Sequence, residues 1–472
     1  MTNELKGKVN YSVNENIAIL EVDNPPVNPL SSGVRAGLSE YIAKANNDES
    51  IEGIILTGAG RSFIAGADIS EFGQKPDGPD LHTALKEIEF SKKPVLAAIN
   101  GTALGGGLET ALVCNYRMGT NKAIVGLPEV NLGLLPGAGG TQRLPRLIGP
   151  SQALKMMIAG TPMSAKKALQ QGVIDAISEN SLMDDAIAFL QEKIGLDLNE
   201  HPRVRDKNEK VLEARGDDNL LSEAKALAAK TRRGQFAPGQ IIACVEAAIN
   251  EDDFDIGMKK ESEYFLECLI NPQREAMIHI FFGERAASKI SDIPKETPLL
   301  PINSAGIVGS GTMGGGIAMN FANAGIPVLV LDQDEKNLER GMGVIEKNYQ
   351  MMVDRGRMTQ EQKDMVLGLI TPTLSYEDLS DVDIAVEAVY ENLELKQEIF
   401  KSLDTVTKDH AILASNTSGL DIDAIASSTK RPGKVVGTHF FSPANIMRLL
   451  EVVRGKDSSD ETMATVMSIG KR

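Results

Sequence analysis

Residues 97–109 read AAINGTALGGGLE and decide the architecture of the first part of this chain. An apolar run ending at Ile99 predicts a strand, the glycines at 105–107 predict a tight turn, and residues 108–113 predict a helix. Glycine lets a ligand approach the backbone closely, and the free N–H groups of a helix start stabilise developing negative charge. The segment is therefore typical of an oxyanion hole, with Glu109 in the first helical turn beside it.

A second carboxylate of interest lies in residues 126–144, which read GLPEVNLGLLPGAGGTQRL. Apolar, glycine and proline residues surround Glu129 there, an environment that raises the pKa of a carboxyl group and suits acid–base chemistry. Taken singly, Glu109 is also explained as a carboxylate favoured at a helix N-terminus, and Glu129 as an ordinary loop residue. Each motif by itself is a weak signal, and only their combination carries weight.

The chain alternates between strand-like and helix-like stretches in two regions, which predicts an α/β fold. In the first region we expect strands at 18–22, 51–57 and 95–99 and a helix at 30–46. Helices dominate between residues 150 and 290, with expected examples at 220–231, 239–250 and 259–269. Strands resume at 304–308, 328–331, 383–388, 411–414 and 434–438, with a helix at 317–324. A proline-rich join at Pro294, Pro298 and Pro301 marks the main expected domain boundary.

Composition excludes several classes of protein. The formal net charge of -16 argues against a nucleic-acid partner and against an anionic membrane surface. No apolar run is long enough to predict a transmembrane helix. The three cysteines, Cys114, Cys244 and Cys268, are scattered without a CxxC, so we expect a reducing compartment, no disulfide framework and no metal site.

Residues 305–314, AGIVGSGTMG, place a G-x-G-x-x-G turn between an apolar strand and a helix. Gly309 allows the tight turn, Gly311 lets a pyrophosphate approach, and Gly314 lets the helix pack closely on the strand. Asp332 ends the next strand, where a carboxylate accepts from ribose hydroxyls and disfavours a 2′-phosphate. The pattern predicts a Rossmann domain that binds NAD in preference to NADP.

Four segments resemble the crotonase (enoyl-CoA hydratase/isomerase) superfamily over about residues 5–200. They are DNPPVN (23–28), RSFIAGADI (61–69), GGGLE (105–109) and PEVNLGLLPGAGGTQRLPR (128–146). The resemblance implies that the N–H groups of Ala67 and Gly106 form an oxyanion hole for a thioester enolate. It also implies that Glu109 and Glu129 are the two acid–base carboxylates, a pair that favours hydration over isomerisation.

Residues 303–472 resemble 3-hydroxyacyl-CoA dehydrogenase through ASNTSGL (414–420), GTHFFSP (437–443) and LLEVV (449–453). The resemblance implies that His439 is the general base, that Glu451 orients and charge-balances it, and that Ser418 binds the substrate oxygen. Outside these motifs His439 would be interpreted as a core residue and Ser418 as a helix cap. The cofactor-binding residues implied are Gly309, Gly311, Met313, Gly314, Asp332, Glu391 and Lys396. Ser442 stands where the family often has Asn, so one contact is expected to differ.

The whole arrangement resembles the bifunctional enzymes of fatty acid β-oxidation in bacteria and peroxisomes. It implies a crotonase-like ββα domain at 1–200, a helical linker at 201–300 that completes the hydratase side, and a partial Rossmann NAD-binding domain at 301–472. By comparison with that family, we expect the last part to be truncated before its final strand, a catalytic Asn and a C-terminal helical domain.

The expected function is hydration of trans-2-enoyl-CoA, coupled in the complete protein to NAD-dependent oxidation of the 3-hydroxyacyl-CoA. Isomerisation of a 3-enoyl-CoA and a silent CoA-ester or NAD-binding scaffold are the alternatives. A thiolase is the expected pathway partner. The expected compartment is a bacterial cytoplasm, with the peroxisomal matrix as the alternative. Acyl chain length, oligomeric state and the basic residues that bind CoA are left open.

Overall fold

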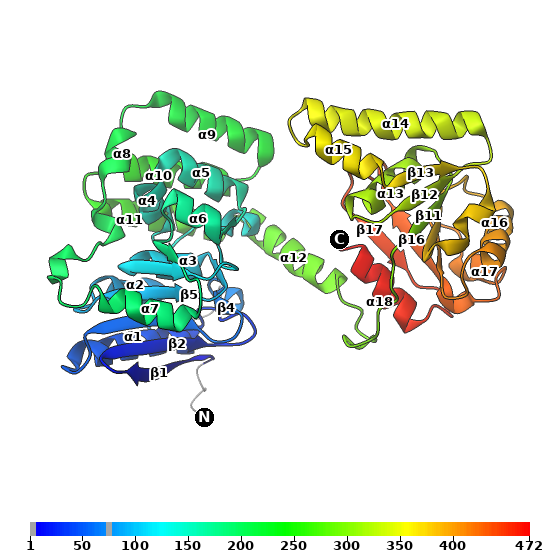
Figure 1. Cartoon of the computed structure of the whole chain (residues 1–472). Coiled ribbons are helices and arrows are strands. Elements are labelled where there is room, and N and C mark those ends of the chain that lie inside the picture. Colours follow the sequence, from blue (N-terminus) through cyan, green and yellow to red (C-terminus); the bar gives the residue numbers. More distant parts are fainter. Residues whose placement is uncertain (1–5, 72–77) are drawn as a thin grey trace. The chain divides into compact units, whose positions relative to one another are not determined.

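The computed structural model describes residues 6–71 and 78–472. The chain forms two compact units, Met1–Arg285 and Ala286–Arg472, each with its own sheets and core (Figure 1). The division falls upstream of the proline-rich join, and the segment from residue 201 to 285 belongs to the first unit. The three-part division drawn from the sequence stays a prediction.

Two sheets form the centre of the first unit. The larger has the order β1-β2-β3-β5-β7-β10, and all of its pairs are parallel except β1 with β2. Its strands are β1 (Lys8–Asn14), β2 (Ile17–Asp23), β3 (Gly53–Gly58), β5 (Val95–Ile99), β7 (Tyr116–Gly119) and β10 (Ala176–Ile177). The smaller has the order β4-β6-β8-β9, with β4 (Ser62–Ile64), β6 (Thr102–Leu104), β8 (Ile124–Gly126) and β9 (Met163–Ser164).

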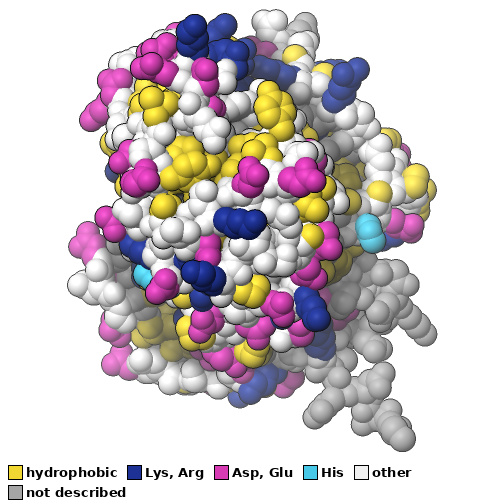
Figure 2. All heavy atoms as spheres, turned by 90° about the vertical axis from the view of Figure 1, so that its right-hand side faces the viewer, with side chains coloured by type: hydrophobic (Ala, Val, Ile, Leu, Met, Phe, Trp, Pro, Cys, Tyr) yellow, Lys and Arg dark blue, Asp and Glu magenta, His cyan; other side chains and the backbone are white. Residues whose placement is uncertain are grey.

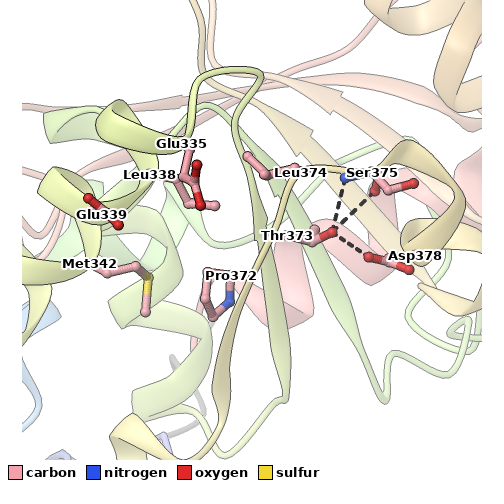
Figure 3. A pocket seen from close by; sticks show the side chains of 9 residues that line it. All are labelled: Glu335, Leu338, Glu339, Met342, Pro372, Thr373, Leu374, Ser375 and Asp378. Atoms are coloured by element: carbon pink, nitrogen blue, oxygen red, sulfur yellow. Dashed lines mark hydrogen bonds between the residues drawn. The ribbon is translucent and has the colours of Figure 1, made fainter.

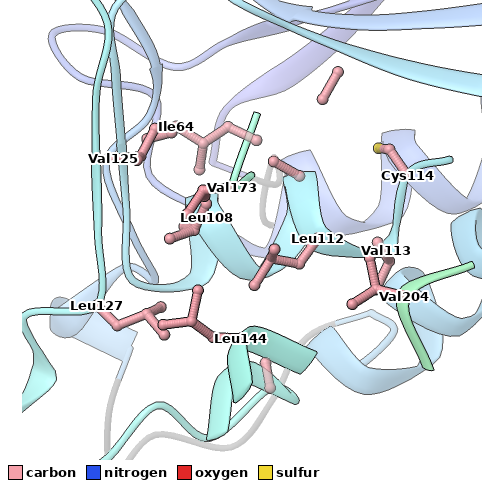
Figure 4. Packing of buried hydrophobic residues seen from close by; sticks show 14 of the residues in the cluster. Ile64, Leu108, Leu112, Val113, Cys114, Val125, Leu127, Leu144, Val173 and Val204 are labelled. Atoms are coloured by element: carbon pink, nitrogen blue, oxygen red, sulfur yellow. The ribbon is translucent and has the colours of Figure 1, made fainter. Parts of the chain in front are cut away.

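The chain passes repeatedly from the larger sheet to the smaller one and then into a helix, as β5, β6 and α3 (Gly106–Val113) do. The crossing from β5 to β6 is tight, because a Cβ built on Gly101 would lie 1.9 Å from the carbonyl oxygen of Arg61. Every residue of α3 is buried, and Figure 4 shows Leu108 and Leu112 among neighbouring apolar side chains. A helix buried on all sides carries Glu109 into the core with it.

Helices cover these sheets and build the rest of the first unit (Figure 1). They are α1 (Ser32–Asn47), α2 (Leu81–Glu89), α4 (Gly140–Ile148), α5 (Pro150–Ala159), α6 (Ala165–Gln171), α7 (Leu182–Gln191), α8 (Glu209–Glu213), α9 (Asp218–Thr231), α10 (Ala237–Asn250), α11 (Phe254–Ile270) and α12 (Pro272–Ala287), whose last two residues are assigned to the second unit. The expected helices at 30–46, 220–231 and 239–250 are confirmed within two residues. α11 begins earlier than expected, because Asp253 caps it by accepting from the N–H of Asp255.

The second unit is a seven-stranded sheet in the order β13-β12-β11-β14-β15-β16-β17, parallel except at β17. Its strands are β11 (Ala305–Val308), β12 (Val328–Leu331), β13 (Ile370–Thr373), β14 (Ile384–Glu387), β15 (Ile412–Ser415), β16 (Val435–Phe440) and β17 (Leu450–Val453). Its helices are α13 (Thr312–Asn323), α14 (Glu335–Asp354), α15 (Gln360–Leu367), α16 (Leu393–Val406), α17 (Ile422–Ala426) and α18 (Asp460–Ile469). The strand order reverses between β11 and β14, the place where such sheets bind ligands.

Buried apolar residues cover both faces of this sheet in separate clusters, which is why its strands are nearly continuous apolar runs. The molecular face in Figure 2 carries interspersed acidic and basic side chains around small hydrophobic patches. Within residues 6–71 and 78–472, no helix is both long and apolar enough to cross a membrane.

Candidate active sites

Glu109 is held in the core of the first unit by the turn that precedes α4 and by the first residue of α4. Its side chain is 2% exposed, and its Oε1 accepts from the N–H groups of Ala138 at 2.7 Å and Gly140 at 2.8 Å. A Cβ on Gly140 would lie 2.8 Å from the same oxygen, so only glycine leaves the carboxylate in place. Burial raises the pKa of Glu109, while the two N–H groups and Arg143 oppose that rise.

Glu129 opens the 3₁₀-helix Glu129–Leu132 and faces the glycine turn from the other side. A Cβ on Gly105, which has φ +54°, would lie 2.8 Å from Glu129 Oε1. The Oε2 atom is buried and has no hydrogen-bond partner among the described residues. Burial, and then the charge of Glu109, hold the pKa of Glu129 well above its usual range. The two carboxyl groups therefore lie close together in different environments.

The predicted oxyanion-hole residues are neighbours in space. Gly106 is the first residue of α3, so its N–H is not used inside the helix, and a Cβ on it would lie 3.4 Å from the Ala67 nitrogen. Ala67 is held by a bridge to Leu30, in which the Leu30 N–H donates to Gly66 at 2.9 Å. Within the described part of the chain, no acceptor is present for the N–H of Ala67 or Gly106.

A third buried carboxylate, Glu261 of α11, joins this site and was missed by the sequence analysis. Its side chain is fully buried and accepts from the N–H of Gly139 at 2.7 Å, the N–H of Thr141 at 3.1 Å and the Thr141 hydroxyl. Burial and the nearby Glu109 raise the pKa of Glu261 to about 8. The only signal in the sequence is a glutamate on the buried stripe of α11.

Arg143 fixes the position of α4 through a buried ion pair with α2. Its guanidinium makes two hydrogen bonds to Glu89 of α2, at 2.8 and 2.7 Å, and both side chains are almost fully buried. The guanidinium also lies 5.1 Å from the ring centre of Phe254 on α11. A bidentate buried pair of this kind fixes the orientation of the helix whose N-terminus holds Glu109.

The glycine-rich turn of the second unit has the shape expected for a dinucleotide site. Gly309 has φ +105°, and a Cβ there would lie 2.7 Å from the carbonyl oxygen of Ala388. A Cβ on Gly314 would lie 1.8 Å from the Gly309 carbonyl oxygen, so helix and turn touch closely. Around Gly311, by contrast, no described atom lies within 4 Å of such a Cβ. Met313 is half-buried in the same helical turn and packs on the core.

Asp332 follows β12 and is tied to that turn. Its Oδ2 accepts from the N–H of Ser310 at 3.0 Å and from the Ser310 hydroxyl at 2.7 Å. Burial alone would raise the pKa of Asp332, but these hydrogen bonds hold it below its usual value. A carboxylate beside an open turn at a helix start fits a nucleotide with free ribose hydroxyls, so the residues fit NAD.

The predicted dehydrogenase residues form two pairs. His439 Nδ1 lies 2.7 Å from Glu451 Oε2. Ser418 donates its N–H to Glu391 Oε1 at 3.0 Å, and Thr417 donates its hydroxyl to the same oxygen at 2.5 Å. Although burial alone would raise the pKa of Glu391, the hydroxyl of Thr417 and the charge of Lys396 hold it below its usual value.

Lys396 lies next to Glu391 and is fully buried. Its Nζ is 2.7 Å from Glu387 Oε1 and 3.3 Å from Glu391 Oε2. Glu387 also accepts from the hydroxyl of Ser415 at 2.7 Å. Lys396 was predicted to line the cofactor site. In the structure it forms an ion pair with Glu391.

An open pocket lies at the β13 edge of the second unit, between α14 and the chain that follows β13 (Figure 3). Its lining combines carboxylates such as Glu335 and Asp378 with apolar side chains such as Leu338 and Met342. None of the predicted site residues lines it. Across the described residues, no group of three His, Cys, Asp or Glu side chains is arranged to hold a metal ion.

Comparison with known families finds a match for each of the two units. Residues 12–224 match the enoyl-CoA hydratase/isomerase family, and residues 304–472 match the NAD-binding domain of 3-hydroxyacyl-CoA dehydrogenase. With the two sheet architectures, these matches confirm the α/β fold class with a crotonase-like and a Rossmann unit. The chain thus joins a segment similar to the enoyl-CoA hydratase/isomerase family to a segment similar to the NAD-binding domain of 3-hydroxyacyl-CoA dehydrogenase.

Three curated relatives are similar to this chain over nearly all of its length. The chain is 40% identical to the peroxisomal bifunctional enzymes of Danio rerio and Homo sapiens, over 98% and 97% of its length and 63% of each relative. It is 36% identical to a peroxisomal fatty acid beta-oxidation multifunctional protein of Arabidopsis thaliana, over 97% of its length and 65% of that protein. The chain thus spans a little under two thirds of these relatives.

Proposed function

We propose that the first unit hydrates trans-2-enoyl-CoA esters. The observation that carries the proposal is a pair of carboxyl groups at the glycine turn: Glu109, which is buried, and Glu129, which is half-buried with a buried Oε2 atom. Among the described residues, the N–H groups of Ala67 and Gly106 at this turn have no acceptor. Glu109 accepts two N–H donors, which favours its ionised form. Glu129 has no such support for its Oε2, which favours its protonated form.

This difference assigns the roles. Glu109 takes a proton from water as the water oxygen bonds to the β-carbon, and Glu129 gives its proton to the α-carbon. The N–H groups of Ala67 and Gly106 hold the thioester oxygen while it carries the enolate charge between these two events. The cycle closes when the proton on Glu109 returns to Glu129 through solvent.

The experiment is the loss of conjugated enoyl-thioester absorbance when the chain meets crotonyl-CoA without NAD. We expect Glu109→Gln and Glu129→Gln each to reduce kcat by about 10²–10⁴-fold, the usual worth of one acid–base group. Glu87→Gln, at an exposed position on α2, is the matched control and should retain full activity. Folded wild-type protein that leaves crotonyl-CoA unchanged would remove the proposal.

Isomerisation of 3-enoyl-CoA is the second candidate. The position of Glu129 beside the glycine turn allows it, because a single carboxyl group that, in its ionised form, removes a proton from one carbon and returns it to another is sufficient for a double-bond shift. The two functions separate in Glu109→Gln, which should lose hydration and keep isomerisation. Activity with a 3-enoyl-CoA and none with a 2-enoyl-CoA would favour isomerisation as the main function.

For the second unit we propose NAD-dependent oxidation of 3-hydroxyacyl-CoA, as a property of the whole protein. When bound, NAD would accept the hydride. With Nδ1 engaged by Glu451, the Nε2 of His439 is the nitrogen left to take the hydroxyl proton. Ser418 would hold the substrate oxygen, Glu391 would line the site, and Gly309, Gly311, Met313 and Gly314 would seat the pyrophosphate.

NAD binding is testable by titration calorimetry. Asp332→Asn should weaken NAD binding by about tenfold and improve NADP binding relative to NAD, because the carboxylate repels a 2′-phosphate. Glu339→Gln, at an exposed position on α14, serves as the charge-matched control and should bind as wild type does. If Asp332→Asn leaves the NAD/NADP ratio unchanged, Asp332 does not contact the ribose.

A thiolase is the proposed pathway partner, because the 3-ketoacyl-CoA made by the complete protein is a substrate for thiolysis. Co-elution of a thiolase with the tagged chain would support it, and its absence at high protein concentration would oppose it.

The compartment proposed from the sequence is a bacterial cytoplasm, with the peroxisomal matrix as the alternative. The names of the three relatives support the alternative, and fractionation of source cells would decide.

A further inference from the structure

Residues 138–141, which form the end of the turn before α4 and the first two residues of α4, offer four consecutive N–H groups to two buried carboxylates in alternation. Ala138 and Gly140 donate to Glu109 at 2.7 and 2.8 Å. Gly139 and Thr141 donate to Glu261 at 2.7 and 3.1 Å. The turn is therefore clamped from opposite sides, by the proposed catalytic base on α3 and by a glutamate on α11.

Two successive hydrogen bonds, from Gln142 to Thr141 and from Thr141 to Glu261, orient the Glu261 carboxyl group. The Gln142 side-chain amide donates to the Thr141 hydroxyl at 3.0 Å and to the carbonyl oxygen of Cys244 at 2.9 Å. The Thr141 hydroxyl in turn donates to Glu261 Oε2. Three donors face the Glu261 carboxyl group, which therefore accepts hydrogen bonds at both oxygens.

α11 meets the turn along one face, at positions four residues apart. A Cβ on Gly257 would lie 2.3 Å from Gln142 Oε1, which lets α11 close onto α4. At the other end, the Phe265 ring lies 2.4 Å from where a Cβ on Gly137 would stand. Glu261 lies between these two contacts and is the charged residue among the buried positions of α11.

We propose that Glu261 is a positioning residue of the hydratase site, holding the turn whose other N–H groups orient Glu109. The inference rests on the proposed function of the first unit and extends it to a helix outside the ββα core. This positioning role explains why a fully buried carboxylate is present although its burial costs desolvation free energy. Without Glu261, two N–H groups of the turn would be left unpaired.

The test compares Glu261→Gln with Glu263→Gln, which alters an exposed glutamate of the same helix. The amide that replaces the carboxylate in Glu261→Gln cannot accept from both sides of the turn, so the turn loosens. We expect kcat for crotonyl-CoA hydration to fall by about 100-fold, the effect of a small misplacement of a catalytic group, with KM little changed. Thr141→Val should show a smaller loss, Thr141→Ser should retain activity, and Glu263→Gln should match wild type.

A packing role alone would not move the pH profile, so the profile separates positioning from packing. The titratable groups around Glu261 are Glu109, Glu129, Arg143 and Cys244. Where Glu261 is ionised, its charge helps to raise the pKa of Glu129, so Glu261→Gln should shift the descending limb of kcat to lower pH. Loss of activity in proportion to lost folded protein, with an unmoved profile, would overturn the proposal.

Hydrogen–deuterium exchange at residues 138–141 tests the inference without relying on activity. In Glu261→Gln these amides should exchange faster than in wild type or Glu263→Gln, at equal global stability. Unchanged exchange would overturn the role of Glu261 whatever the chain catalyses. If the wild type fails to hydrate crotonyl-CoA but exchange responds, the proposed function fails while the clamp stands.

Discussion

His439 and Glu451 face each other directly across the antiparallel pair β16–β17, with Nδ1 and Oε2 2.7 Å apart. Side chains opposite one another on a sheet share a face, so the strand register alone brings the two groups together. The pair extends from the edge of the sheet, where Glu451 is half exposed and His439 is one fifth exposed.

This register predicts the tautomer of His439. In the neutral imidazole, Nδ1 should carry the proton and donate it to Glu451, which leaves Nε2 as the acceptor. Glu451→Ala should shift the population toward the Nε2–H form. Nitrogen chemical shifts of labelled histidine, assigned with His439→Gln, report the tautomer, and an unchanged spectrum in Glu451→Ala would contradict the pairing.

The rate of hydration should depend on pH as a bell. Activity needs Glu109 ionised and Glu129 protonated, and both pKa values are raised, that of Glu129 the more strongly. The ascending limb should therefore lie above the usual carboxyl range, and the descending limb at higher pH still. Because the groups interact, the two apparent pKa values belong to the pair. A rate that is flat from about pH 5 to 9 would refute this assignment.

Glu129 should make the first unit less stable as pH rises. Its folded-state pKa lies above the unfolded value, so the protonated form stabilises the fold at low pH and this contribution is lost as pH rises toward the folded pKa. Glu129→Gln, which is neutral throughout, should match wild type near about pH 5 and melt at least about 2 °C higher near about pH 8. Equal melting temperatures at both pH values would show that Glu129 is not held in a costly environment.

A methyl group at Gly140 should disturb Glu109 directly. The added Cβ would lie 2.8 Å from both Glu109 Oε1 and Pro136 Cβ. We expect Gly140→Ala to reduce hydratase kcat by about 100-fold and to destabilise the unit by about 1–3 kcal/mol. Gly239→Ala in α10 is the control, because among the described residues no atom outside its own stretch of helix lies within 4 Å of the new Cβ. It should keep full activity, and wild-type rates from Gly140→Ala would contradict the geometry.

Much of the fold was predictable from local pattern. The strands expected at 95–99 and 328–331 are found with those bounds, because each is an apolar run enclosed by turn residues. Strands such as β4 and β9 were not predicted, since segments of two or three residues carry no period of their own and exist only through their partners. Among the candidate site residues, Asp332 could be chosen from spacing, whereas its partner Ser310 could not.

By itself, the sequence determined the two sheet-and-helix units, the glycine turns and the choice of Glu109, Glu129 and Asp332 as candidate site residues, because local spacing and backbone freedom decide these features. The tertiary structure alone decided which groups meet. Glu261 lies far from Glu109 along the chain, and only the packing of α11 on α4 brings its carboxylate to the same turn. Hydrophobic periodicity shows that a helix face is buried, but the partner of a polar group on that face depends on the close packing of distant segments.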